Sequence, residues 1–420
     1  MGAFVCGLLI SFVPLRAASQ SGEADTTRLW DLVGELLDRN PEIEASRQQM
    51  TLMGAKVAQE ASLPPPELIF MREGMPSFRY SEAMFSRIEL MQMFQFPSKL
   101  ATRKEVAEIN AEHAHHDHMA KELEVIYRLK TAYAELWYAQ QSIRLTRENG
   151  ELLRQALAVV RARFGAGTAG EEEVLKASLE SARNDNLILS LRQREVAAKS
   201  MIMALLDRPD LDTLGTAVMP DAPVLGVPLD TLITIGMEYR PMLLHDSLSV
   251  VEQKTLLSAA RQEFIPDFRL GIQYMTAPTG GFNGWTVTAG VTLPFAPWTL
   301  GARAGRIDES EAAVNRASAE LDASRAMVRS EIRETYSRAA ADRDQVESYR
   351  GAILPRAGAS LRAALASYRS GKGDFLMVLD SSRMLRDVRM EELMLRMDFA
   401  RSIAALEQEI GVMDLTHIRY

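Results

Sequence analysis

The sequence has one cysteine, Cys6, among its 420 residues. One cysteine cannot form an intramolecular disulfide, and it excludes a zinc site built from several cysteines and a Cys-x-x-Cys redox site. A concentrated basic stripe is also missing, and the formal net charge is −8. Nucleic-acid phosphates are bound by clustered lysine and arginine. We therefore expect no nucleic-acid partner.

The start of the chain also lacks an apolar run long enough for a membrane-spanning helix. The apolar run found there, residues 3–15, reads AFVCGLLISFVPL. It is shorter than the roughly 20 apolar residues of a membrane-spanning helix. The run suits the apolar region of a signal peptide, with Ala17-Ala18-Ser19 as a cleavage site of small residues. Residues 1–19 are thus a predicted signal peptide, and lipid attachment at Cys6 is the alternative.

Enzyme motifs are lacking too. The sequence contains no His-Glu-x-x-His motif, no candidate Ser-His-Asp set in a turn context, and no glycine-rich phosphate loop after a strand. The segment GAGTAG at 165–170 leads into three glutamates, whose charges would repel a phosphate. We therefore predict a protein that is not an enzyme and has no cofactor.

Proline is missing from three long stretches, 98–208, 298–354 and 356–420. Proline is excluded from helix interiors, so these stretches are candidate long helices. Between Ser98 and Phe164, apolar residues recur at coiled-coil-like spacing, and such a helix would be about 100 Å long at 1.5 Å per residue. Glycines then predict the turns of two long antiparallel helical hairpins, with Asp374 as an N-cap in the second: Gly165, Gly167, Gly170, Gly371 and Gly373.

The chain also repeats itself. Asn40-Pro41 and Arg240-Pro241 each follow an apolar helical run at an offset of 200, and Phe164 and Tyr368 precede the two glycine turns at an offset of 204. Matching residues that occur in the same order at nearly the same offset indicate a tandem duplication. We predict a first repeat at 20–208, a proline-rich connector at 209–228, a second repeat at 229–414 and a tail at 415–420.

Each repeat holds two segments that alternate like strands of about ten residues. The clearest one places threonines and glycines on one face and apolar side chains on the other: Trp285, Val287, Ala289, Val291 and Leu293. That pattern suits lipid on one side and water on the other, with aromatic residues near the strand ends (Phe78, Tyr80, Phe282, Trp285 and Trp298). A soluble sheet packed on a helix is the alternative.

Four strands cannot close a barrel, and an open sheet edge in lipid would leave backbone N–H and C=O groups unpaired. If the strands lie in a membrane, several chains must share one barrel. Three chains would contribute twelve strands.

These features together resemble the TolC-type outer-membrane efflux channel family over about residues 28–413. The resemblance rests on the repeat, the strand pairs, the Phe96-Pro97 and Leu293-Pro294 exits, and Tyr-x-x-Gly followed by Val-Leu-Asp. It implies a homotrimer in the cell outer membrane, with a twelve-stranded β-barrel continued by an α-barrel across the periplasm. It further implies a passive conduit that meets a periplasmic adaptor and an inner-membrane pump of the resistance-nodulation-division type.

Two alternatives remain, a soluble periplasmic coiled-coil scaffold and an adaptor protein, and the duplicated strand pairs argue against both.

The segment ASLPPPELIF also looks like a segment of the heavy-metal branch of the family, which serves cobalt-zinc-cadmium and copper-silver pumps.

The resemblance assigns roles at the hairpin ends. The glycine turns would be adaptor-docking tips, and a constriction would form around Asp380, with Met377 at the outer acidic position of the family, Tyr368 at its tyrosine, and Asp374 as a further candidate. Gly373 replaces a gate arginine, which puts a gate held by Arg and Tyr bonds in doubt.

A histidine cluster, EHAHHDHM, is the remaining feature: His113, His115, His116 and His118. Imidazole is a common ligand for zinc, copper and nickel. On one helix the pairs 113/116 and 115/118 point in different directions, so a metal site would need Asp117, Met119 or a neighbouring helix. A solvated polar face is the alternative.

Overall fold

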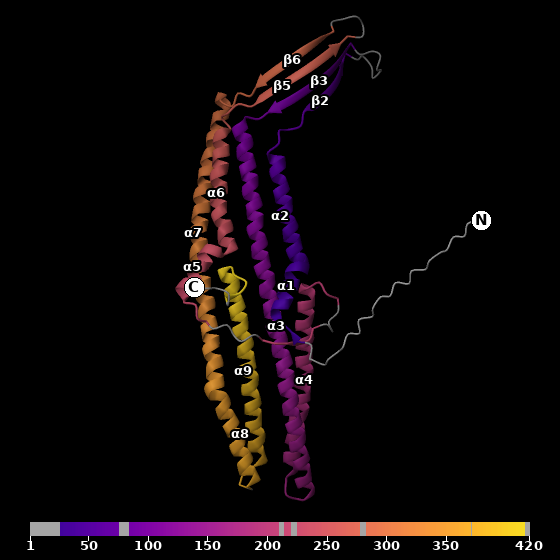
Figure 1. Ribbon diagram of the computed structural model, residues 1–420, viewed down its shortest axis with the longest axis vertical. Coiled ribbons are helices and arrows are strands. Elements are labelled where there is room, and N and C mark those ends of the chain that lie inside the picture. Colours follow the sequence, from indigo (N-terminus) through magenta and orange to yellow (C-terminus); the bar gives the residue numbers. More distant parts are fainter. Residues whose placement is uncertain are drawn as a thin grey trace, which may run out of the picture.

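The computed structural model describes residues 26–74, 84–209, 214–219, 225–277, 283–370 and 372–415. The expected signal peptide with Cys6, the aromatic residues Phe78, Tyr80 and Phe282, the tip residue Gly371, and parts of the connector and the tail lie outside these ranges. The molecule is a long bundle of helices with a β-sheet at one end and the helical turns at the other (Figure 1).

The same order of elements occurs twice along the chain. Two helices, α1 (Leu29–Arg39) and α2 (Pro41–Glu60), lead to the strands β2 (Glu67–Glu73) and β3 (Phe85–Phe94), and then to the helices α3 (Pro97–Gly165) and α4 (Glu171–Leu205). Then α5 (Leu229–Tyr239) and α6 (Pro241–Gln262) lead to β5 (Phe268–Thr276) and β6 (Gly284–Val291). The helices α7 (Pro297–Ser348), α8 (Leu354–Arg369) and α9 (Phe375–Ile410) complete the second series.

The break between α1 and α2 follows from two adjacent residues. Asn40 caps α2, because its side-chain oxygen accepts hydrogen bonds from the backbone N–H groups of Glu42 (2.9 Å) and Ile43 (3.0 Å). Pro41 occupies the first helical position, where no N–H is needed. The Asn40 amide also donates to the carbonyl of Leu205 at 2.7 Å, which ties this break to the end of α4.

Helix was predicted on both sides of Pro355, and the structure shows how the two parts connect. The chain does not break there: α7 passes into a five-residue π-helix, Tyr349–Ile353, and continues as α8. Proline has no N–H to donate, and its ring crowds the carbonyl of the preceding turn. A π turn is wider than an α turn. Directly before Pro355 it accommodates the missing N–H and the proline ring, so the second hairpin stays continuous.

The four strands form one antiparallel sheet in the order β2-β3-β5-β6. Its register places Phe70 opposite Ile88, Ile88 opposite Tyr274 and Tyr274 opposite Trp285, so one face carries a row of large apolar side chains. Figure 1 shows the sheet standing clear of the helices, and Val287 is 75% exposed. The soluble alternative, a sheet packed on a helix, is therefore wrong for the described residues.

The strands are seven to ten residues long, close to the predicted length. The apolar face predicted for the last strand, from Trp285 to Leu293, is shorter in the structure. Trp285, Val287, Ala289 and Val291 lie on β6, but β6 ends at Val291, so Leu293 lies just beyond it and is exposed.

The main core lies halfway along the bundle, where α1, α3, α4 and α9 meet. Leu36, Leu129, Leu136 and Ile202 are fully buried there. The Tyr133 hydroxyl, at the same level, donates to the carbonyl of Thr27 (2.7 Å) and accepts from the N–H of Val218 (2.8 Å). It thereby anchors the two-residue strands β1 (Thr26–Thr27) and β4 (Thr216–Ala217), which pair in parallel.

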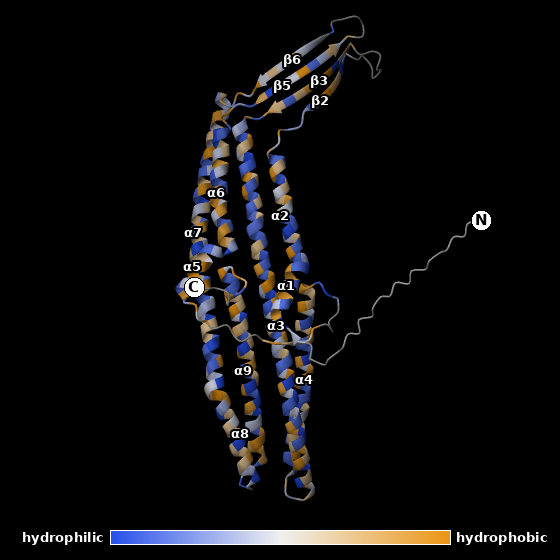
Figure 2. Ribbon diagram, in the orientation of Figure 1, coloured by the Kyte–Doolittle hydropathy of each residue, from blue (hydrophilic) through white to orange (hydrophobic). Residues whose placement is uncertain are grey.

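Elsewhere the helices alternate hydrophilic and hydrophobic residues along their length (Figure 2). Among the residues that the structure describes, no helix combines the length and hydropathy that a membrane-spanning helix needs.

Candidate functional site: the hairpin tips

The first tip is a turn between α3 and α4. Gly167 has φ +74, a left-handed conformation that favours glycine. Gly165 and Gly170 have no heavy atom within 4 Å of the place where a Cβ would stand. The three glutamates Glu171–Glu173 occupy the first turn of α4, where the helix dipole favours negative charge.

The second tip is tighter. A Cβ on Gly373 would lie 2.9 Å from the Cβ of Ser367 and 3.0 Å from the backbone nitrogen of Tyr368. Asp374 caps α9 by accepting a hydrogen bond from the N–H of Leu376 at 3.2 Å, so the predicted N-cap is confirmed. Gly373 is thus required because the backbone passes too close for a side chain.

The two tips contact each other through a pair that the sequence did not reveal. Arg163 of α3 donates a hydrogen bond to the Tyr368 hydroxyl, and its guanidinium carbon lies 5.0 Å from the centre of the tyrosine ring. Phe375, which is buried, packs beside them against Val160 and Ala177 of the first hairpin. Tyr368 therefore has an arginine partner although Gly373 stands at the expected arginine position.

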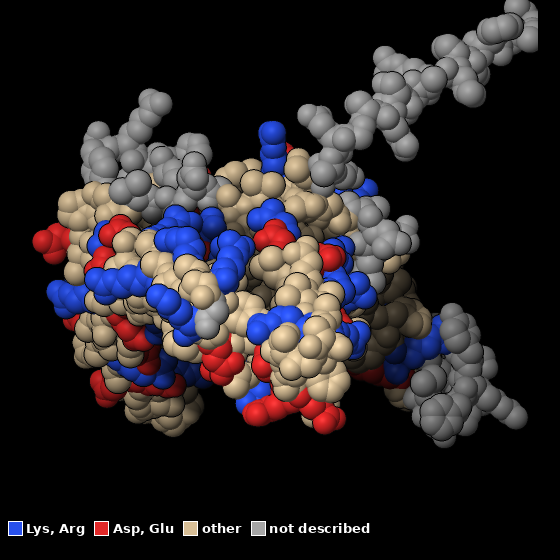
Figure 3. Space-filling view, turned by 90° about the horizontal axis from the view of Figure 1, so that it is seen from below, with Lys and Arg blue, Asp and Glu red and all other residues tan. Residues whose placement is uncertain are grey.

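Two of the predicted constriction residues, Asp380 and Met377, are exposed on α9, whereas Tyr368 lies on α8 against Arg163 and Asp374 is the N-cap of α9. The side chain of Asp380 is 74% exposed, and Met377 is 60% exposed. The nearest cation to Asp380 is Arg383, one turn along the helix, with 3.5 Å between Nη1 and Oδ1. Seen from below, basic and acidic side chains lie close together at this end of the molecule (Figure 3). The carboxylate of Asp380 is accessible to solvent in the single chain.

A buried ion cluster joins the hairpins above the tips, and no sequence motif pointed to it. Glu180 of α4 has a side chain only 3% exposed, and it lies 2.5 Å from Arg383 and 2.9 Å from Arg386 of α9. Burial by itself raises the pKa of Glu180, but the hydrogen bonds and charges of the two arginines outweigh it and lower the pKa below its usual value. Glu180 is therefore a charged group in the seam between the two hairpins.

The four clustered histidines do not converge, because they face different helices. The ring of His113 lies against that of His245 of α6, tilted by 54° with 4.2 Å between ring centres, and its Nε2 lies 3.6 Å from Glu252. His118 faces α2 instead, with Nδ1 2.7 Å from the Ser46 hydroxyl.

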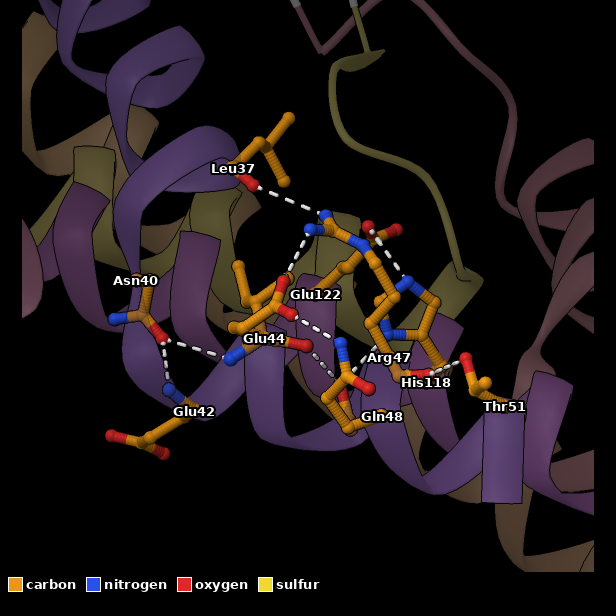
Figure 4. Close-up of polar contacts among 11 residues, drawn as sticks. Leu37, Asn40, Glu42, Glu44, Arg47, Gln48, Thr51, His118 and Glu122 are labelled. Carbon is orange, nitrogen blue, oxygen red and sulfur yellow. Dashed lines mark hydrogen bonds and ion pairs between the residues drawn. The ribbon is translucent and has the colours of Figure 1, made fainter. Parts of the chain in front are cut away.

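The other contacts of the histidine cluster also do not bring its side chains together around a position for a metal ion. Figure 4 shows His118 directed at Glu122, its ion-pair partner at 3.2 Å. His116 lies beside Glu112 at 3.9 Å and beside the ring of His115 at 5.7 Å. In the described part of the chain, no three His, Cys, Asp or Glu side chains are placed to hold a metal ion. The structure therefore does not assemble the candidate metal site.

Burial lowers the pKa of His113, and the neighbouring His245 lowers it further. The contact between the two rings thus contributes to helix packing at the interface of α3 and α6, and burial favours the neutral form of His113 there.

The chain is similar to a known protein family and to solved structures. Residues 32–207 and 239–412 match the family model described as outer membrane efflux protein. The sequence matches no protein with a curated description.

Solved structures resemble the chain over nearly its whole length. The outer-membrane channel OprN has a TM-score of 0.75 at 18% identity, covering 91% of this chain and 89% of the other. The Campylobacter jejuni CmeC outer membrane channel has a TM-score of 0.76 at 16% identity, covering 91% and 85%. CusC has a TM-score of 0.76 at 16% identity, covering 93% of each. At these identities the likeness shows the fold.

Proposed function

Since this chain belongs to the outer membrane efflux protein family, whose channels lie in the outer membrane and extend into the periplasm, we propose that it is the channel subunit of a tripartite efflux system. Three copies form a passive conduit between a periplasmic adaptor with its inner-membrane pump and the cell exterior. The observation that carries the proposal is the exposed apolar face of the sheet at one end of a long helical bundle.

Lipid contact explains that apolar face. The aligned rows Phe70, Ile88, Tyr274, Trp285 and Leu68, Leu90, Ile272, Val287 run across all four strands. The opposite face carries Glu89, Gln273 and Thr286 in one row, which suits a water-filled interior. An apolar patch of this extent on a soluble scaffold or adaptor would expose hydrocarbon to water without benefit.

Trimer formation follows from the sheet edges. Within the described residues of the single chain, β2 and β6 are the outer strands of the sheet, and each has one edge without a neighbour. Lipid cannot satisfy those backbone groups, so β6 of one copy pairs with β2 of the next. Three copies of four strands close a twelve-stranded barrel.

The opposite end supplies the adaptor surface. The first tip presents Gly165, Gly167 and Gly170, and the second presents Gly373 together with Gly371, which lies outside the described residues. Small residues at the far end of two long hairpins let the ends of partner helices approach closely. The partner is a helical hairpin of the adaptor, and the pump is of the resistance-nodulation-division type.

The cargo is proposed from two features. The resemblance of residues 61–70 to the heavy-metal branch favours metal cations, and the accessible carboxylate of Asp380 supports a passage for cations. In a three-fold arrangement, three copies of Asp380 at a narrow opening would reinforce a negative potential and concentrate cations there.

The test has two stages. Membrane fractions from cells making the protein are washed with high salt and then extracted with detergent. The expected result is a trimer, resistant to salt, that appears in the detergent extract and conducts ions in planar bilayers. A monomer released by salt alone would refute the channel. Transport of a metal cation or an organic compound, compared between cells with and without the protein, then decides the cargo.

A further inference from the structure

Arg383 lies between two carboxylates. Its Nη2 is 2.5 Å from an oxygen of Glu180, and its Nη1 is 3.5 Å from an oxygen of Asp380. In the described part of the chain, these are the two carboxylates within ion-pair distance of Arg383. Arg383 therefore bridges the two carboxylates, and the charge that Asp380 presents to solvent depends on how closely the arginine approaches it.

The surroundings of the two carboxylates decide this competition. Glu180 is almost fully buried, and an unpaired buried carboxylate is strongly unfavourable. Asp380 is 74% exposed, where water solvates the charge and an ion pair contributes little. Arg383 therefore makes its closer contact with Glu180, and its contact with Asp380 is longer and weaker.

The second arginine does not compete in the same way. Arg386 contacts Glu180 at 2.9 Å and also its chain neighbour Asp387 at 2.8 Å. If the charge of Glu180 were lost, Arg386 would keep a carboxylate partner, whereas Asp380 would be the one left to Arg383.

We propose that Glu180 is a positioning residue for ion selection at the tip: it draws Arg383 into the seam between the two hairpins and so limits how far Arg383 neutralises Asp380. Glu180 contacts no transported ion in this scheme, because its carboxylate is buried. The inference rests on the proposed function, in which Asp380 lines the conduit.

The test measures cation-over-anion preference from reversal potentials in planar bilayers under a salt gradient. Asp380→Asn is expected to lose the preference, since it removes the charge itself. Glu180→Gln keeps the size and loses the charge, and its preference should fall to that of Asp380→Asn. The double variant Glu180→Gln with Arg383→Gln removes the competing cation and should recover the preference of the unmodified protein.

A purely structural role of Glu180 predicts a different pattern. If Glu180→Gln only loosened the hairpins, removal of Arg383 would not restore selectivity, and equal loss in the single and double variants would overturn the inference. Unchanged selectivity in Glu180→Gln, together with loss in Asp380→Asn, would overturn it as well. Unchanged selectivity in Asp380→Asn would instead refute the proposed place of Asp380 in the conduit.

Two further variants keep the test decisive if Glu180→Gln does not assemble. Arg383→Gln alone should leave the preference unchanged or raise it slightly, because the contact between the arginine and Asp380 is long, at 3.5 Å, in the unmodified protein. A fall in preference would contradict the inference. Arg386→Gln is the matched control, and its preference should equal that of the unmodified protein because Arg383 and Glu180 remain paired.

Discussion

Arg163, two residues before α3 ends at Gly165, donates a hydrogen bond to the hydroxyl of Tyr368 at the corresponding end of the second hairpin. The guanidinium also lies over the tyrosine ring, at 5.0 Å from its centre. One arginine thus links the two hairpins by a polar and a cation–π contact at once. Separation of the tips would break both contacts.

Tyr368→Phe removes the hydrogen bond and keeps the ring. We expect the tips to separate more readily by about 1 kcal/mol, the net value of a typical hydrogen bond, and Arg163→Ala to have a larger effect because it removes the cation–π contact too. Single-channel recordings should show longer or more frequent high-conductance states. Arg161→Ala, at an exposed neighbouring position, is the control and should leave conductance unchanged.

Arginine substitutions in β6 test which face meets lipid. Val287→Arg and Val291→Arg should each cost about 2–4 kcal/mol if these side chains lie near the bilayer midplane. Thr288→Arg, on the opposite face opposite Gly271, should be milder because that face meets water. The measurement is the yield of membrane-inserted trimer. Equal yields for all three variants would count against the barrel.

Alanine substitutions at two tip glycines compare a position where a Cβ would contact neighbouring atoms with one where it would not. Gly373→Ala places a Cβ 2.9 Å from that of Ser367 and should distort the second tip, whereas Gly165→Ala meets no atom within 4 Å. We expect reduced crosslinking of Gly373→Ala to an adaptor, with trimer yield preserved, and normal crosslinking of Gly165→Ala. If both variants crosslink as the unmodified protein does, the second tip is not part of the docking surface.

Acid should weaken the seam between the hairpins. The arginines lower the pKa of Glu180 in the folded protein relative to its ordinary value of 4.5. A carboxylate with a lowered folded pKa contributes stability that is fully present above its unfolded pKa and is lost as the pH falls through the folded pKa.

The difference in thermal stability between the unmodified trimer and Glu180→Gln should therefore be constant above about pH 5 and shrink as the pH falls below the ordinary value of 4.5. Melting temperatures measured across this range in detergent check the prediction. A difference that grows in acid would show that the ionised form of Glu180 does not stabilise the fold.

Much of the fold could be predicted because it depends on local chemistry. The absence of proline from Ser98 onward and the glycines after Phe164 predicted a helix that the structure places at Pro97–Gly165. The alternation around Val287 predicted β6 because side chains of a strand point to opposite faces in turn. The π turn at Tyr349–Ile353, directly before Pro355, was not predicted.

The candidate site was less predictable, and the histidines show why. Their spacing on one helix already indicated that they diverge, but only the packed helices show that His113 meets His245 and that His118 meets Ser46. The partners of Glu180 lie more than 200 positions away in the chain, so no local pattern could connect them.

By itself, the sequence determined where this chain is helical, where it forms strands and where it turns, because proline, glycine and side-chain alternation act on the nearest turns of the backbone. The tertiary structure alone decided which polar side chains meet: Arg163 with Tyr368, and Glu180 with Arg383. The physical reason is that the free energy of an ion pair or hydrogen bond depends on distance and burial. Both are set by how the two hairpins pack against each other.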